Sequence, residues 1–138
     1  MKRTAIKRKP SSDKVLDDLV RECIRLTSRG YCKRCHKFVG EEMIEAAHLY
    51  GRKRKTLRWD LRNVHGLCKS NPLTGGKGCH FLIDNDHISK TSFMYEVLGK
   101  EDIEDLQELA NKTIKDYPID RNRIKQYLKE KIRILEEL

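Results

Sequence analysis

The chain contains no apolar run long enough to cross a membrane, and no hydrophobic segment follows its basic start as in a secretory signal. We therefore expect an intracellular protein with no membrane partner. The sequence also lacks internal repeats, and its 138 residues suit one domain and are too few for two ordinary ones. Because only 38% of the residues are hydrophobic and 37% are charged, we expect one modest core of the kind that a structural metal often reinforces.

Positive charge is concentrated in the first two thirds of the sequence. Of a net charge of +9, residues 1–99 contribute 21 Lys and Arg against 11 Asp and Glu, whereas residues 100–138 carry 9 against 10. A basic region beside a neutral one is typical of nucleic-acid binding. A well-solvated basic surface would have the same composition, so charge alone does not separate the two interpretations.

The N-terminal part predicts a basic arm followed by a helix. Residues 1–11 are basic and aperiodic, and we expect them to be disordered. Apolar residues from Val15 to Leu26 then recur at helical spacing, with Ser12 as the expected N-cap and Gly30 as the stop.

The middle of the chain predicts turns, short strands and loops. Residues 31–40 form a tight turn segment, and residues 43–49 have the pattern of a short strand. We expect a second short strand near 56–59, inside a basic loop over residues 51–62. Residues 70–78, with a proline and three glycines, predict another loop.

Helices are predicted for the rest of the chain. One begins at about Cys79, and a short one covers residues 92–98. Two amphipathic segments, 103–110 and 124–135, are separated by Pro118 and suggest an antiparallel helical hairpin. We therefore expect an α+β protein in which a core over residues 12–99 precedes a C-terminal hairpin over residues 100–138, itself a candidate dimer or DNA contact.

The five cysteines indicate a metal site, because thiols stay reduced in a protein without a secretory signal. Cys32 and Cys35 have the spacing of a metal knuckle, and Cys68 and Cys79 supply two more thiols, although ten residues separate them. Four thiolates suit tetrahedral zinc and leave no ligand position open, so the site is predicted to be structural. The alternative is that some of these cysteines are simply small buried residues. Cys23 lies on the apolar stripe of the first helix and is assigned to the core.

A candidate catalytic group lies between and beside the cysteine pairs. His48 lies on the predicted strand, Asn63 follows fifteen residues later, and His80 opens a predicted helix directly after Cys79. This order is the ββα-metal layout, in which phosphodiester cleavage needs a base for water and a divalent cation. We assign His48 as the base, Asn63 as the residue that holds its loop, and His80 as a ligand of a catalytic Mg²⁺ or Mn²⁺.

The loop between the base and Asn63 is strongly basic. Such a loop can neutralise several phosphates without reading base edges, which predicts salt-sensitive binding to the shape of DNA. The six candidate DNA-binding residues are Arg52, Lys53, Arg54, Lys55, Arg58 and Arg62. A solvated loop is the alternative.

These motifs resemble the HNH (ββα-metal, His-Me finger) endonuclease family, and within it the NinG (Rap) family of phage recombination proteins, from about Leu16 to the C-terminus. The residues that carry the resemblance are Cys32-x-x-Cys35, Ala47-His48-Leu49-Tyr50, Leu57-Arg58-Trp59-Asp60, Asn63-Val64-His65, Cys68 and Cys79-His80. The resemblance implies cleavage of branched recombination intermediates such as Holliday junctions and displacement loops. For a phage-encoded protein it implies a location in the host cytoplasm. A homodimer would match the approximate two-fold symmetry of a junction.

One position departs from the family pattern. Many HNH enzymes have a metal-binding Asp or His just before the base, where this chain has Ala47. Asp84 would share a helix face with His80, and His87 would approach if that helix extended far enough. Both are also explained as a solvated helix end. His36 and His65 have no role in this scheme.

Three other functions explain part of the pattern. A zinc DNA-binding module without catalysis accounts for the cysteines and the charge but leaves the order of His48, Asn63 and His80 unexplained. A nicking or packaging-associated HNH endonuclease fits the motif as well as a junction-cleaving one does. A zinc deaminase would need H-x-E and P-C-x-x-C, and neither is present around His48 or Cys32.

Overall fold

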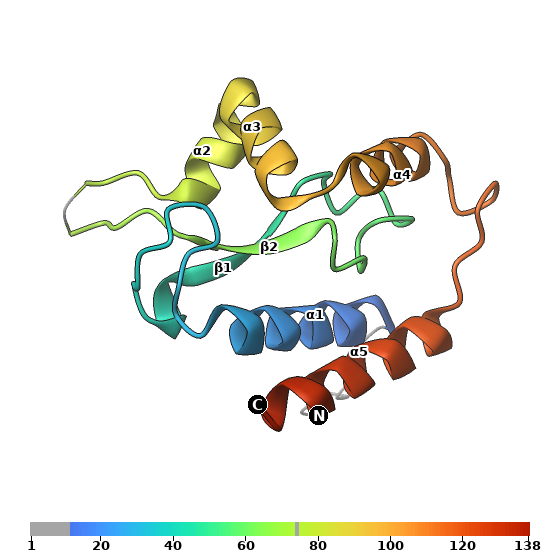
Figure 1. Cartoon of the computed structure of the whole chain (residues 1–138). Helices are drawn as coiled ribbons and strands as arrows, with labels where there is room; N and C mark the ends of the chain where they lie inside the picture. Colours follow the sequence, from blue (N-terminus) through green and yellow to red (C-terminus); the bar gives the residue numbers. More distant parts are fainter. Residues whose placement is uncertain (1–11, 74) are drawn as a thin grey trace, which may run out of the picture.

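The computed structural model describes residues 12–73 and 75–138 and has an α+β architecture, as predicted (Figure 1). A two-stranded antiparallel sheet lies between α1 on one face and α2 and α3 on the other. The elements in chain order are α1 (Ser12–Ser28), the 3-10 turn η1 (Glu41–Met43), β1 (Ile44–His48), β2 (Val64–Cys68), α2 (Cys79–Asn85), α3 (His87–Val97), α4 (Lys100–Ala110) and α5 (Arg121–Glu136). The arm predicted for residues 1–11 lies outside the described residues.

Helix α1 follows the predicted apolar stripe, and its buried side chains include Leu16, Val20 and Ile24. Ser12 is the first residue of the helix and not the cap before it. The predicted stop is confirmed, because the chain leaves the helix at Gly30 with φ +86°. A Cβ there would lie 2.6 Å from the ring of Phe38, so both the backbone conformation and the space favour glycine.

The predicted strand at 43–49 is confirmed as β1, but the strand expected near 56–59 is wrong. Those residues form turns, in which the N–H groups of Leu57 and Asp60 donate to carbonyls three residues earlier. The apolar side chains that suggested a strand are buried separately: Leu57 packs against α4 and Trp59 against α1. The second strand is β2, whose Val64 pairs with His48 across the sheet.

Two hydrophobic clusters lie on opposite faces of the sheet. Val64 belongs to the cluster with α1, whereas Ala47 and Leu67 belong to the cluster with α2 and α3. Space is tight at Gly66 on the α1 side, because a Cβ there would lie 2.1 Å from the Ser28 hydroxyl oxygen and 3.0 Å from a methyl carbon of Ile44. The sheet is thin, and helices on both faces supply most of the core.

The predicted C-terminal helical hairpin is wrong, although both helices exist. Helix α5 lies along α1, where Leu128 is fully buried and its carbonyl oxygen lies 3.8 Å from the Cys23 sulfur (Figure 1). Helix α4 instead packs on the 51–62 loop through Leu106 and Ala110. The periodicity identified the apolar faces correctly, but it contained no information about which surface each face would cover.

Of the two helices that follow the 70–78 loop, one begins where it was predicted and the other begins earlier. Helix α2 starts at Cys79 as expected, whereas the helix expected at 92–98 already begins at His87. The Asp86 side chain caps it by accepting a hydrogen bond from the N–H of Ile88 at 3.2 Å. Within the described ranges, no helix combines the length and the apolar composition needed to cross a membrane.

Candidate functional site

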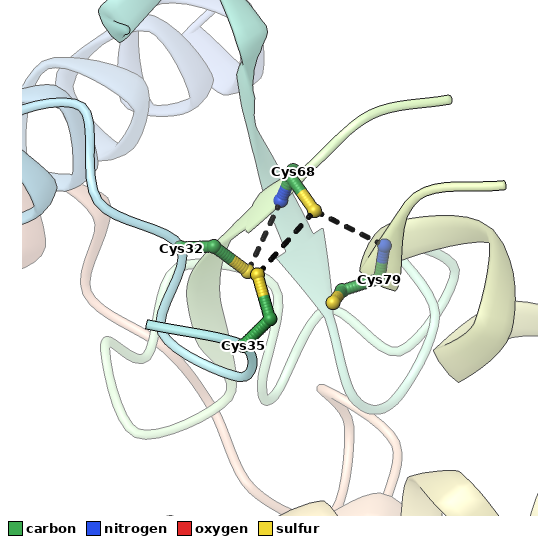
Figure 2. Close-up of side chains that lie close together, drawn as sticks. All are labelled: Cys32, Cys35, Cys68 and Cys79. Carbon is green, nitrogen blue, oxygen red and sulfur yellow. Dashed lines mark hydrogen bonds between the residues drawn. The ribbon is translucent and has the colours of Figure 1, made fainter. Parts of the chain in front are cut away.

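The four cysteines predicted to bind zinc converge at one point, with their sulfurs facing one another (Figure 2). Cys32 and Cys35 lie in the turn after α1, Cys68 ends β2, and Cys79 begins α2. All four sulfurs lie within 4.8 Å of one another, and those of Cys35 and Cys68 are 4.0 Å apart. Tetrahedral zinc with bonds of about 2.3 Å separates its sulfur ligands by about 3.8 Å, so the cluster can hold such an ion.

The wide spacing between Cys68 and Cys79 is explained by a loop that returns to its starting point. The two arms of the loop pair as an isolated bridge between Asn71 and Gly76. Gly78 then passes so close to β2 that a Cβ would lie 2.3 Å from the Lys69 carbonyl carbon. The N–H of Cys79 consequently donates to the Cys68 sulfur at 3.3 Å. The loop thus places the second cysteine pair as effectively as a short knuckle.

Hydrogen bonds and burial shift the pKa values of the thiols in opposite directions. Burial would raise the pKa of Cys32, but backbone N–H groups, including that of Cys68 at 3.4 Å, lower it to about 7. Burial raises the pKa of Cys79 to about 12, although the Arg34 guanidinium, 3.5 Å from its sulfur, opposes this. A dication bound among the sulfurs would favour the thiolate form of each. The donor set therefore suits a structural zinc ion.

His48, the predicted base, ends β1 with its ring partly buried. Its Nε2 lies 3.0 Å from the carbonyl oxygen of Arg58. A carbonyl only accepts hydrogen bonds, so Nε2 carries the proton and the neutral ring has its lone pair on Nδ1. Burial lowers the pKa of His48 below 6.5, against the bond to Arg58, which raises it. The ring is therefore neutral at pH 7, as a general base must be.

Asn63 is fully buried and joins the two ends of the basic loop. Its amide nitrogen donates to the carbonyls of Tyr50 at 3.0 Å and Leu57 at 3.1 Å, and its amide oxygen accepts from the N–H of Tyr50 at 2.8 Å. Its backbone carbonyl also accepts from the N–H of Leu49, next to His48. Asn63 therefore braces the loop that follows His48.

His80 lies in the first turn of α2 between two carboxylates. Its Nδ1 is 3.2 Å from Glu45 on β1, and its Nε2 is 3.3 Å from Asp84, one turn further along the helix. Asp84 therefore reaches His80 as anticipated. Helix α2 ends at Asn85, so His87 belongs to the next helix and the condition for its approach is not met.

The structure does not join His48 and His80 directly. They line two neighbouring cavities, and Arg21 and Ala46 contribute to the walls of both. Over residues 12–73 and 75–138, the cysteine cluster is the single group of three or more His, Cys, Asp or Glu whose ligand atoms come this close. A shared catalytic cation between the two imidazoles stays a prediction.

Asp17, on α1, is a site residue that the sequence analysis missed. Its carboxylate accepts hydrogen bonds from Arg52 at 2.7 Å, from Arg58 at 2.6 and 3.0 Å, and from the indole of Trp59 at 2.9 Å. Burial would raise its pKa, but these four bonds lower it to about 2. The one sign of this role in the sequence was that Asp17, an acidic residue, lies beside the apolar stripe of an amphipathic helix, three residues before Val20.

Much of the charge of the basic loop is paired within the protein. Arg52 and Arg58 bind Asp17, and Arg62 binds Asp60 and two further aspartates on α4. Lys55 approaches Asp13 at 3.3 Å, and Arg54 donates to the Ala110 carbonyl. Lys53 is exposed and has no such partner in the described part of the chain. The cations that line the cavity beside His48 are also paired: Arg52, half exposed, binds Asp17, and Arg21 from α1 binds Asp18 at 2.8 Å.

His36 and His65, for which the sequence predicts no catalytic role, do not line the His48 cavity. His65 packs edge-on against Phe93, with ring centroids 5.4 Å apart, and its Nε2 donates to the Arg62 carbonyl at 2.9 Å. His36 is exposed and lies 3.6 Å from Glu96.

Comparisons with models of known protein families, with curated proteins and with solved structures find no match to this chain.

Proposed function

We propose that this chain is a metal-dependent DNA endonuclease of the HNH type, with His48 as the general base. The observation that supports this most directly is the hydrogen bond between His48 Nε2 and the Arg58 carbonyl, which leaves the Nδ1 lone pair available. The ring borders a small cavity of about 70 Å³ that is also lined by Arg21, Arg52 and the Asp17 carboxylate that binds Arg52. A neutral imidazole beside two guanidinium groups suits a water molecule attacking a phosphodiester.

In this mechanism Nδ1 of His48 takes a proton from the attacking water, while Arg21 and Arg52 stabilise negative charge on the phosphate. Asn63 keeps the loop that carries the Arg58 carbonyl in place. A catalytic Mg²⁺ or Mn²⁺ would be held by His80 together with Glu45 or Asp84, and it would stabilise charge on the phosphate and the leaving oxygen. Structural zinc would fix β2 relative to α2 and so hold His80 near the edge of β1.

The narrower proposal is cleavage of branched DNA, such as Holliday junctions and displacement loops, by an intracellular protein acting as a homodimer. It is supported by the resemblance of the motif between Cys32 and His80 to the NinG (Rap) family. One face of α5 is covered by α1. A dimer would therefore use exposed residues of α4 or the outer face of α5, where Tyr127 and Ile134 lie. Sedimentation that shows a strict monomer on junction DNA would exclude the dimer.

The test is a cleavage assay on a junction, a displacement loop, a flap and linear duplex, each with Mg²⁺, Mn²⁺ or chelator. We expect divalent-dependent cleavage that His48→Ala abolishes while zinc content and DNA binding are retained. His36→Asn is a matched control, because this exposed histidine lies outside the His48 cavity and Asn tolerates its φ of 62°. No cleavage of any substrate by the wild-type protein would refute the enzyme proposal.

A second candidate function is a zinc DNA-binding module without catalysis. Two observations favour it: Ala47 occupies the position before His48, and His48 and His80 line separate cavities. This module would bind DNA equally well with and without the His48→Ala substitution and would cleave nothing. A nicking or packaging-associated HNH enzyme would instead cleave duplex substrates as readily as branched ones.

A further inference from the structure

The peptide group between Arg58 and Trp59 is held in place by hydrogen bonds of the side chains on both of its sides. Its carbonyl oxygen accepts the hydrogen bond from His48 Nε2 at 3.0 Å. The side chains on both sides of this peptide, the Arg58 guanidinium and the Trp59 indole, bind the same carboxylate, that of Asp17. The peptide that faces His48 is therefore held from its two ends by one residue of another element.

Asp17 is well suited to hold that peptide still. Its side chain is only 9% exposed, and neither oxygen lacks a donor. Helix α1 is itself fixed by Leu16 and Val20, which are almost completely buried in the core beneath it. Arg58 binds through two nitrogens to two oxygens, a geometry that restricts rotation as well as distance.

We propose that Asp17 is a positioning residue for His48, because it fixes the Arg58–Trp59 peptide whose carbonyl selects the Nε2–H tautomer. The inference rests on the proposed role of His48 as a base. If the peptide rotated, its carbonyl would leave Nε2, and the proton could move to Nδ1, the nitrogen that must accept the proton of water. Asp17 thus connects the fold of α1 to the protonation pattern of the candidate active site.

The chain offers a matched control on the same helix. Asp13, one turn earlier, also ties α1 to the basic loop and to α5, since its oxygens lie 3.3 Å from Lys55 and 2.8 Å from Arg121. It makes none of the bonds to Arg58 or Trp59. Replacing Asp13 therefore removes a comparable ion pair without releasing the peptide that holds His48.

The experiment compares Asp17→Asn and Asp13→Asn in the full-length, zinc-loaded protein labelled with ¹⁵N histidine. The ring nitrogen shifts of His48 report its tautomer directly and require no cleavage activity. We expect the wild type and Asp13→Asn to show protonated Nε2, and Asp17→Asn to show a mixture of tautomers. Cleavage by Asp17→Asn should fall by about 10- to 100-fold in kcat with little change in KM, as when an orienting hydrogen-bond partner of a reactive histidine is lost.

Retention of the wild-type tautomer in Asp17→Asn would overturn the inference. An equal change of tautomer in both variants would also overturn it, because it would indicate a general loosening of α1. Should Asp17→Asn fail to fold, Arg58→Lys provides the same test, because lysine keeps the charge and lacks the two-pronged contact. A wild-type protein that cleaves nothing while Asp17→Asn still shifts the tautomer would refute the proposed function and leave the positioning role supported.

Discussion

Replacing Leu128 with alanine tests whether α5 is an integral part of the core. Leu128 is fully buried between α5 and α1, in a cluster with Leu16, Cys23 and Trp59. The substitution removes three carbon atoms, which corresponds to about 2.4 kcal/mol of lost hydrophobic transfer free energy. The cavity left between two packed helices adds to this cost, so we expect the free energy of unfolding to fall by about 3 kcal/mol.

The measurement is thermal and urea unfolding of the zinc-loaded protein, followed by circular dichroism. For a chain of this size, a loss of about 3 kcal/mol lowers the Tm by about 10 °C. Tyr127→Ala is the matched control, because this neighbouring side chain is 58% exposed and its truncation should cost well under 1 kcal/mol. A Leu128→Ala variant as stable as Tyr127→Ala would refute the packing of α5 on α1.

Three further predictions concern zinc, protons and DNA. The chain should bind one zinc ion, as measured by a chelator dye. Cys79→Ser should lower the free energy of unfolding by about 3 kcal/mol, because it opens the loop that zinc closes. Cys23→Ala should leave the zinc content unchanged. NMR titration should show pKa values below 6.5 for His48 and His65, both lowered by burial. These rings therefore stabilise the fold above about pH 6.5 and lose that contribution as the pH falls through their lowered pKa values. Urea unfolding that showed greater stability on acidification below about pH 6.5 would contradict the lowered pKa values. Lys53→Ala should weaken DNA binding and reduce its salt dependence by about one ion without loss of stability; unchanged affinity would remove Lys53 from the interface.

Some of the fold could be predicted from local patterns. The first helix, β1, the loop over 70–78 and the start of α2 were predicted because each depends on neighbours a few residues away in the chain. The cysteine cluster was also predictable, since cysteines that occur in pairs at this spacing are typical metal ligands. The strand at 56–59 was a misinterpretation of two buried apolar residues whose partners lie on different helices.

The placement of the candidate active site could be predicted only in part. Residue types and their order singled out His48, Asn63 and His80, but not the separate cavities that the two histidines line. Asp17 was missed because its importance comes from Arg58 and Trp59, which lie about forty residues further along the chain. A solitary acid on a helix has no distinctive local pattern.

By itself, the sequence determined which residues are apolar, which can ligate a metal and where the chain must turn, because these properties belong to side chains and to short stretches of backbone. Tertiary structure alone decided that α5 packs on α1 and that one buried carboxylate holds the peptide facing His48. It also decided how much of the charge of the basic loop is paired within the protein. These outcomes depend on contacts between distant segments, and the energy of such contacts depends on shape and burial after folding.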